Sequence, residues 1–358
     1  MTPTSSSLFS IVVSTMLLGA CDSRPQEPPD TPNGTGGTGA VGGSGDGGST
    51  SGSGGDSSAS SGGRSGVDPE RFFIYRHDRW PDWILADDRH LYWREGVQIF
   101  RAPKDLSEAP RQFGPLDSSL TTMEMAQDER YVYWVYLSRI RKVDKETEEV
   151  VEFPLGATDG YGASILVDEE RIYVVHQGCL QLNIVPKDGG EPEVVALLHG
   201  SHQGGQTTLA LDEAALYCGS GTTGKILRYD KASGAVTTLL EQPEDKTSEG
   251  VAVDDTYVYW LTASPTFGPE QTLSRRPKIG GAIELLSTHA GNVSVGLHWD
   301  PQAPVLYWTA GGWPNKYDLE KREFTAMAQS ATGTLGGLTV DDEYVYWTTI
   351  HGIMRLPK

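Results

Sequence analysis

The sequence predicts an all-β fold, a seven-bladed β-propeller of four-stranded antiparallel blades. The first observation behind this prediction is a repeat in which a short aspartate turn leads into an aromatic strand. The anchoring aspartates are 41, 40, 44, 42, 46 and 41 residues apart, a period typical of propeller blades. The seven copies are DDRHLYW from Asp87, DERYVYW from Asp128, DEERIYV from Asp168, DEAALYC from Asp212, DDTYVYW from Asp254, DPQAPVLYW from Asp300 and DDEYVYW from Asp341.

The second observation is that the strand after each turn is apolar on both of its faces. In the fifth unit, Tyr257 and Tyr259 lie on one face of the strand, and Val258 and Trp260 lie on the other. A sheet with one face in water would alternate polar and apolar residues instead. Burial of both faces fits blades that are packed radially, each covered by two neighbours.

Four runs of residues in each unit predict the four strands of a blade. An apolar run leads into the aspartate, as at residues 251–253, and the aromatic strand follows at residues 257–260. A third run ends in a basic residue and a turn, as at residues 184–190, and a fourth closes the unit, as at residues 193–198. Val, Ile, Tyr and Trp favour strands, whereas Asp, Pro and Gly favour the turns between them.

Residues 68–358 provide these seven units and leave no room for a second domain. The last unit stops after its third strand, at residues 352–358, so its fourth strand is missing. A spare strand, residues 71–76, precedes the first unit. We expect this N-terminal strand to complete the last blade, because that arrangement closes the ring and removes an unpaired edge.

Residues 1–21 are typical of a bacterial lipoprotein signal peptide. The apolar core at residues 8–18 is too short to span a bilayer. It leads into LGAC at residues 18–21, which resembles the lipobox in which the cysteine, here Cys21, becomes the acylated N-terminus. The residues before the core contain no Lys or Arg, where such signals normally have some. The alternative is a buried apolar helix with a chance cysteine.

Residues 22–67 predict a disordered tether. Gly, Ser and Thr dominate this stretch after a Pro-rich start, and it contains too few apolar residues to offset the entropy of ordering. A flexible chain of this length reaches roughly 35–40 Å. With a lipid on Cys21, the propeller is expected in the cell envelope, anchored to a membrane on its periplasmic or surface-exposed side. The sequence does not distinguish the inner from the outer membrane.

The net charge of −19 limits the partners that the chain can have. Many of the acidic residues lie in the repeat turns, where a carboxylate accepts backbone N–H bonds. Such a balance disfavours nucleic acid and anionic lipid surfaces. We therefore expect membrane contact through the lipid alone, and a monomeric propeller.

The aromatic strands resemble the NHL and YWTD groups of propeller repeats, the latter known from the class B repeats of the low-density-lipoprotein receptor. The matching residues are Val258-Tyr259-Trp260 and their equivalents in the other units, over residues 71–358. With the lipobox and the tether, the chain is similar to propeller lipoproteins of Gram-negative envelopes. Two features depart from YWTD domains: the Thr-Asp after the tryptophan is not kept, and there are seven units rather than six.

The connections between strands two and three, and between one unit and the next, carry nearly all of the length variation. Variable loops on a rigid scaffold are where binding usually occurs, although these loops could also be only solvated connections. The resulting hypothesis is a non-enzymatic binding or scaffold module that recognises an envelope protein or glycan over units three to six. The candidate ligand-binding residues are Tyr161, His199, His202, Gln203, Phe267, Trp313 and Asn315. The opposite face, including Lys187, is expected to tolerate substitution without loss of binding.

The alternative is a metal-dependent hydrolase or lyase with its site in the central channel. Gluconolactonase-type propellers hold a metal there with carboxylates and asparagines, and streptogramin B lyase, similar to the NHL group, uses histidines and glutamates. The channel candidates for a divalent cation, which prefers oxygen ligands, are Asp82, Glu124, Glu249 and Asn292. No zinc-binding histidine spacing and no serine nucleophile elbow are found, so no catalytic residue is predicted and no other cofactor is expected.

The remaining two cysteines form an even pair in an exported chain. Cys218 stands where the repeat has tryptophan, and Cys179 is expected to begin the third strand of the preceding unit. Disulfides form in oxidising compartments, so a bridge between these two blades is one expectation. Two buried free thiols are the other.

Overall fold

The computed structural model describes residues 13–14, 73–76, 81–115, 124–156, 164–198, 207–221, 223–241, 247–263, 270–290, 294–310, 313–327 and 337–358. The chain divides into two compact units, residues 1–17 with 67–358 and residues 18–66. The second unit lies outside the described residues. The expected tether and nearly all of the expected signal peptide lie outside them too.

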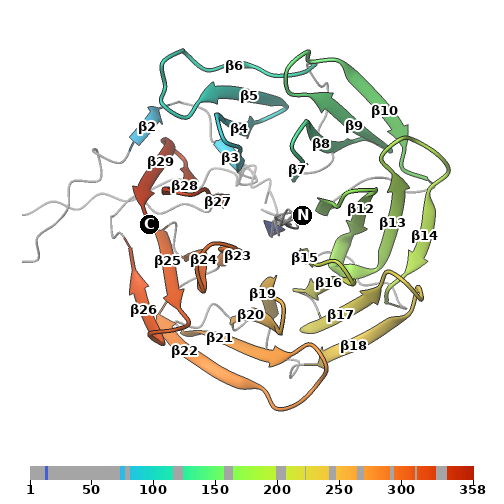
Figure 1. Ribbon diagram of the computed structural model, residues 1–358, viewed down its shortest axis with the longest axis vertical. Coiled ribbons are helices and arrows are strands. Elements are labelled where there is room, and N and C mark those ends of the chain that lie inside the picture. Colours follow the sequence, from blue (N-terminus) through green and yellow to red (C-terminus); the bar gives the residue numbers. More distant parts are fainter. Residues whose placement is uncertain are drawn as a thin grey trace, which may run out of the picture. The chain divides into compact units, whose positions relative to one another are not determined.

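Seven antiparallel sheets form the blades of a propeller, which confirms the predicted fold class (Figure 1). Six of the sheets run in sequence order from an inner to an outer strand, and the seventh ends in the N-terminal strand β2. Blade by blade, the strands are β3 (Pro81–Ala86), β4 (His90–Glu95), β5 (Gln98–Pro103) and β6 (Arg111–Gln112); β7 (Met125–Gln127), β8 (Tyr131–Tyr136), β9 (Arg139–Asp144) and β10 (Val150–Pro154); β11 (Ser164–Val167), β12 (Arg171–His176), β13 (Gln181–Pro186) and β14 (Glu193–Ala196); β15 (Thr207–Leu211), β16 (Ala215–Ser220), β17 (Lys225–Asp230) and β18 (Val236–Glu241); β19 (Thr247–Val253), β20 (Tyr257–Ala263), β21 (Glu270–Pro277) and β22 (Glu284–Ala290); β23 (Ser294–Trp299), β24 (Val305–Ala310), β25 (Trp313–Asp318) and β26 (Glu323–Ala326); and β27 (Leu338–Val340), β28 (Tyr344–Thr349), β29 (Gly352–Pro357) and β2 (Phe73–Arg76).

Two short elements lie outside this scheme. A 3-10 turn, η2 (Gln177–Cys179), connects β12 to β13. The two-residue strand β1 (Val13–Ser14) pairs antiparallel with β15. Because β1 falls within the expected signal peptide, cleavage before Cys21 would remove it.

The N-terminal strand closes the ring, as predicted. Strand β2 pairs antiparallel with β29, with Phe73 opposite Met354 and Arg76 opposite Gly352. In Figure 1, β2 accordingly lies beside β29, the last strand of the chain. The ring of Tyr75 lies 5.1 Å from that of Trp93, so the closing strand also contacts the first blade.

The hydrophobic core lies in the junctions between blades. Tyr92 packs with Trp134 between the first and second blades, whereas the neighbouring Trp93 packs with Tyr346 between the seventh and first blades. Successive residues of one strand therefore enter the cores on its two sides, which is the burial of both faces that the sequence indicates. Each such aromatic side chain buries roughly 150–250 Å² of surface, as is typical of Tyr and Trp in a core.

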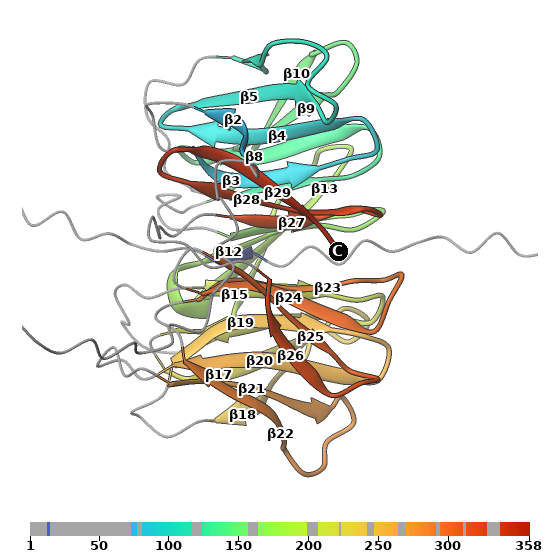
Figure 2. The ribbon, with the colours of Figure 1, turned by 90° about the vertical axis from the view of Figure 1, so that its left-hand side faces the viewer.

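The ring has two faces that differ in their connections. We call the face with the turns from strand one to two and from strand three to four the turn face, and the opposite one the loop face. Figure 2 shows the ring edge-on, with hairpin turns along both of its sides. Across the described residues, no helix is long and apolar enough to cross a membrane.

Ring closure depends on a glycine, which gives a first prediction. Gly352 has φ 140°, and a Cβ there would overlap the carbonyl oxygen of Tyr75 and lie 2.9 Å from Cα of Arg76. We expect Gly352→Ala to lower the free energy of unfolding by about 3 kcal/mol or more, since backbone strain and displacement of β2 add together.

Gly96→Ala is the matched control in a urea titration of both variants. Gly96 also has a positive φ, 58°, but a Cβ there meets nothing within 4 Å. It should cost about 1 kcal/mol, the strain alone. Equal losses in the two variants would mean that β2 does not hold the last blade.

Candidate functional site

Each repeat aspartate organises the turn that follows it. One carboxylate oxygen of Asp128, Oδ1, accepts the backbone N–H groups of Arg130 and Tyr131 at 2.9 and 2.7 Å. The other oxygen, Oδ2, accepts the hydroxyl of Tyr133 at 2.7 Å. The same tyrosine-to-aspartate bond joins Tyr92 to Asp87, Tyr173 to Asp168, Tyr217 to Asp212, Tyr259 to Asp254 and Tyr346 to Asp341. The repeat motif is thus a local hydrogen-bonding unit.

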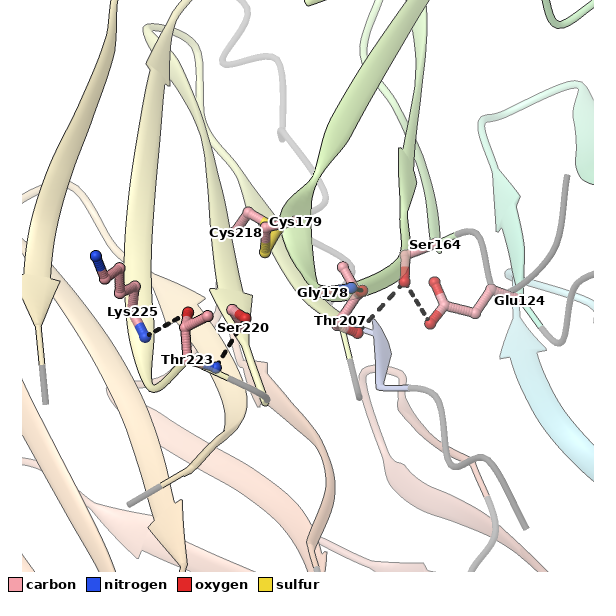
Figure 3. Close-up of a disulfide and its surroundings, with 9 residues drawn as sticks. All are labelled: Glu124, Ser164, Gly178, Cys179, Thr207, Cys218, Ser220, Thr223 and Lys225. Carbon is pink, nitrogen blue, oxygen red and sulfur yellow. Dashed lines mark hydrogen bonds between the residues drawn. A yellow bond between two sulfur atoms is a disulfide. The ribbon is translucent and has the colours of Figure 1, made fainter. Parts of the chain in front are cut away.

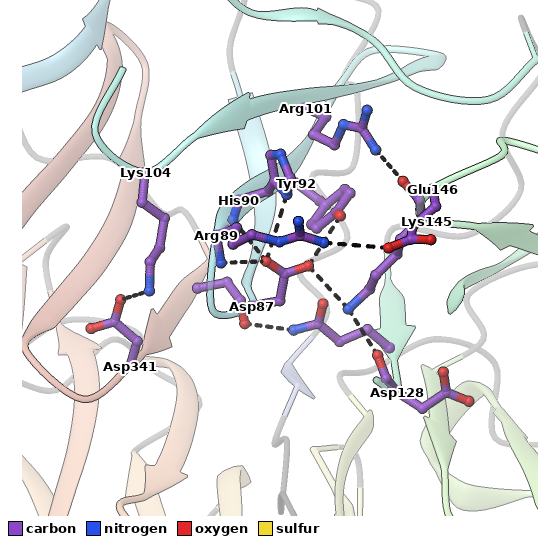
Figure 4. Close-up of polar contacts among 12 residues, drawn as sticks. Asp87, Arg89, His90, Tyr92, Arg101, Lys104, Asp128, Lys145, Glu146 and Asp341 are labelled. Carbon is purple, nitrogen blue, oxygen red and sulfur yellow. Dashed lines mark hydrogen bonds and ion pairs between the residues drawn. The ribbon is translucent and has the colours of Figure 1, made fainter. Parts of the chain in front are cut away.

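A lysine of the following blade then pairs with this aspartate. Lys187, in the turn after β13, places its Nζ 2.6 Å from Oδ2 of Asp128. Figure 4 shows the equivalent contacts of Lys145 with Asp87, and of Lys104 with Asp341 where the ring closes. Equivalent pairs join Lys231 to Asp168, Lys278 to Asp212 and Lys358 to Asp300. We call these contacts inter-blade staples, and the described residues form them at six junctions.

Backbone contacts reinforce three of the staples. Lys142 donates from Nζ to the carbonyl oxygen of Lys187 at 2.9 Å, and Arg355 donates to that of Lys104 at 3.0 Å. Arg101 donates in the same way to the carbonyl oxygen of Lys145. At these junctions the stapling lysine is therefore held through both its side chain and its backbone.

These contacts shift the pKa values of the aspartate and of the tyrosine that bonds to it. Burial by itself would raise the pKa of Asp128, but hydrogen bonds from Lys187, Tyr133 and the backbone of Tyr131 outweigh it and lower the pKa. Burial and the hydrogen bond to Asp128 raise the pKa of Tyr133. The carboxylate stays charged and the phenol stays neutral, so this arrangement is structural and offers no proton for catalysis near neutral pH.

The staples change how the turn face is to be interpreted. The sequence predicted that Lys187→Glu would not weaken binding, but this change would also place a second carboxylate beside Asp128 and so disturb the fold. The signal that could have revealed the staples is the lysine that follows the third run of each unit except the sixth, where Leu319 stands. Its partner lies in another blade, so spacing within one unit does not show it.

Cys179 and Cys218 form a disulfide between the third and fourth blades (Figure 3). Their Cα atoms are 6.1 Å apart, and both residues are buried. Cys179 ends η2, and the backbone N–H of its neighbour Gly178 donates to Oγ1 of Thr207 at 2.9 Å. The bridge fixes one connection of the loop face against the next blade.

Two of the candidate ligand-binding residues lie in a strand rather than in a loop. Trp313 and Asn315 are both in β25, and Asn315 is buried. Trp313 is half-buried and packs against the core that contains Tyr307 and Trp347. The expectation that these two residues lie in a variable loop is therefore wrong. The other five candidates, Tyr161, His199, His202, Gln203 and Phe267, lie outside the described residues.

Two of the four channel candidates, Asp82 and Glu124, are described by the structure, and both have protein partners. Asp82 is paired with the guanidinium of Arg94. Glu124 is buried and accepts hydrogen bonds from the hydroxyl of Ser164 at 2.8 Å and from the backbone N–H of Ile165 at 3.2 Å (Figure 3). The side chain of Glu249 and all of Asn292 lie outside what the structure describes. Among the described residues, no three His, Cys, Asp or Glu side chains are placed to hold a metal ion.

The turn face has two hollows that the sequence did not indicate. One, of ≈ 490 Å³, lies between the third and fourth blades and is lined by Asp168, Glu169, Glu170, Arg171, Tyr173, Glu213 and Lys231. The other, of ≈ 480 Å³, lies between the fourth and fifth blades and includes Arg228, Arg276 and Lys278. Each contains the lysine of a staple, so part of its charge is already neutralised.

Solved structures with a similar fold include a lyase, a designed protein and an extracellular domain. A streptogramin B lyase has a TM-score of 0.62 and 14% identity, over 79% of this chain and 95% of its own. A computationally designed protein, Ika8, has a TM-score of 0.56 and 11% identity, over 80% of this chain and 98% of its own. The extracellular domain of a one-component system protein from B. thetaiotaomicron has a TM-score of 0.56 and 10% identity, over 77% of this chain and 38% of its own.

These likenesses establish the propeller fold alone, because the sequence identities are low. No protein-family model matches the chain, and no curated protein matches it.

The staples predict a measurable share of stability. Lys187→Met keeps the apolar stem and removes the charge, leaving the partly buried Asp128 without its cation. We expect the free energy of unfolding to fall by about 1–2 kcal/mol in a urea titration. Lys321→Met is the control, because Lys321 pairs with Asp318 of its own blade and is 71% exposed. That change should cost about 0.5 kcal/mol or less. Equal costs would show that the staples add nothing beyond a surface ion pair.

The same contacts predict how stability depends on pH. The folded-state pKa values of Asp87, Asp128, Asp168 and Asp341 are lowered, so their contribution is present above about pH 4 and is lost as the pH falls further. The pKa of Tyr217 is raised to about 12 by burial and by Asp212, and that of Tyr133 is also raised. The tyrosine contribution is therefore present below about pH 10 and is lost above it.

The urea concentration at the midpoint of unfolding should be constant between these two pH values. It should fall at lower pH and at higher pH. A midpoint that stays constant up to about pH 11 would show that the tyrosines ionise as readily in the folded state as in the unfolded one.

Proposed function

We propose that this chain is an exported, lipid-anchored propeller of the NHL or YWTD type that binds an envelope protein or glycan through its loop face. One observation carries the proposal: the two faces are built differently. The turn face repeats the same staple at six described junctions, so the charges that recur there stabilise the fold. The blades differ mainly in the connections of the loop face, and a specific binding site requires such differences.

Two further observations support export and an extracellular role. The disulfide between Cys179 and Cys218 belongs to an oxidising compartment. The similar domain from B. thetaiotaomicron is extracellular in that protein, which gives an example of this fold outside the cytoplasm. A lipid on Cys21 and the tether of residues 22–67 would then hold the ring at a membrane as a monomer.

A channel-centred hydrolase or lyase is the second candidate function, favoured by the likeness to streptogramin B lyase. Asp82 and Glu124, however, already have protein partners that satisfy their charge. Metal analysis of the purified chain decides between the two candidates. A stoichiometric divalent cation that is lost in Glu249→Gln would favour the enzyme.

The anchor is tested by Cys21→Ser in the full-length chain. We expect this change to abolish incorporation of labelled fatty acid and to move the protein from the membrane fraction to the soluble fraction, because one hydroxyl cannot take the place of the acylated thiol. Cys179→Ser is the control for loss of a cysteine and should still be acylated. Membrane retention of the Cys21→Ser protein would refute lipid anchoring.

The binding face is tested by Phe267→Ala. Interface energy concentrates in a few aromatic anchors, so a captured envelope partner should bind about 2 kcal/mol more weakly to this variant. Glu169→Ala, on the exposed rim of the turn face, should bind unchanged. The measurement is a titration of the captured partner against wild type and both variants. Weaker binding by Glu169→Ala with unchanged binding by Phe267→Ala would place the site on the turn face.

A further inference from the structure

The junction between the fifth and sixth blades contains a cluster of buried polar atoms that lack partners. Gln271 in β21 is fully buried, and none of the described residues offers a hydrogen bond to either its amide oxygen or its amide nitrogen. His289 lies directly opposite it in β22, and its Nε2 has no partner in the described part of the chain. Nε1 of Trp308 in β24 is also buried, and it has no hydrogen-bond partner among the described residues. Such atoms cost free energy unless something binds them.

The three side chains share one junction. His289 stacks on Phe324 of the sixth blade, with ring centroids 4.8 Å apart and an interplanar angle of 13°. Its centroid is 5.1 Å from that of Trp308. Since directly opposite residues of an antiparallel pair point to the same side, Gln271 also faces the sixth blade. Asn315 lies opposite Trp308 in the β24–β25 ladder and therefore points to the same side as Trp308.

The chemistry of the cluster is neutral. An amide, an indole N–H and an imidazole present hydrogen-bond donors and acceptors without charge. Burial lowers the pKa of His289 to about 4, so its ring carries no charge at neutral pH. The rings of His289, Trp308 and Phe324 add apolar surface beside these groups. A matching ligand carries hydroxyl and amide groups and is itself uncharged.

This junction is also the one whose sixth-blade turn carries Leu319 where the staple lysine stands in the other units. Leu319 packs on the apolar core instead, and Trp299 stacks on Tyr259 at 6.0 Å. The hydroxyl of Tyr317 still donates to the carbonyl oxygen of Leu286 at 3.1 Å. No ion pair forms at the staple position of this junction, although Arg322 of the sixth blade pairs with Glu284 of the fifth.

We propose that the junction of blades five and six is a ligand site for a neutral acetamido sugar, reached when the two blades separate locally. The inference rests on the proposed binding function and names its ligand class. The acetamido and hydroxyl groups of the sugar would satisfy the amide of Gln271, the imidazole of His289 and the indole of Trp308. In the free protein these groups are unpaired, which lowers its stability and leaves them available to the ligand.

The experiment uses the full chain with N,N′-diacetylchitobiose as the probe in calorimetric titrations. Gln271→Leu and His289→Phe remove the unpaired groups while keeping side-chain volume. We expect each to raise the melting temperature of the free protein by about 2 °C or more, because a buried unpaired polar group is removed. We expect each to weaken binding of the probe by about tenfold or more. Gln302→Leu, an exposed change on the turn face, should alter neither.

Three outcomes would overturn the proposal. If the wild-type protein does not bind the probe, an acetamido sugar is not the ligand. If Gln271→Leu and His289→Phe bind the probe as tightly as wild type, the binding site lies elsewhere. A lower melting temperature in both variants would show that these groups have partners in the free protein. If the wild type does not bind the probe but Phe267→Ala still binds a captured envelope partner more weakly, the proposed function stands and only the sugar site is refuted.

Discussion

The contact between the Asp of one blade and the Lys of the next is the interaction on which the rest of this ring depends. Five of the six stapled aspartates, Asp128 among them, also accept two backbone N–H groups and a tyrosine hydroxyl. These bonds tie the turn, the aromatic strand and the neighbouring blade to one carboxylate. The aromatic cores supply most of the burial, but they are non-directional. The staple fixes the register of one blade against the next, because a charged hydrogen bond requires a defined distance and angle.

The ring is not uniform, and its exceptions gather over blades three to six. A disulfide joins blades three and four, and the junction of blades five and six has Leu319 in place of the staple lysine. The same junction contains the unpaired groups of Gln271, His289 and Trp308. Departures from a repeat that cost stability are expected where function requires them. The candidate loops of the sequence and the unpaired groups of the structure thus point independently to the same part of the ring.

The prediction from sequence worked where local patterning decides the outcome and was wrong where it does not. Trp313 and Asn315 flank Pro314 and follow two glycines, a composition typical of a loop. The structure nevertheless places Pro314 in β25, where Thr309 lies opposite it. The staples were missed because a lysine at the end of a strand looks like an ordinary turn residue. Its significance lies in an aspartate 59 residues away in the case of Lys187 and Asp128.

The sequence alone determined the number of blades, their strand order and the closure by residues 71–76, because all three follow from a period and from apolar patterning along the chain. Only the tertiary structure decided how Lys187 meets Asp128, that Glu124 is bonded to Ser164, and that Gln271 and His289 face Trp308 across a junction. These contacts join residues of different blades, so they depend on distances in space that no spacing in the sequence encodes.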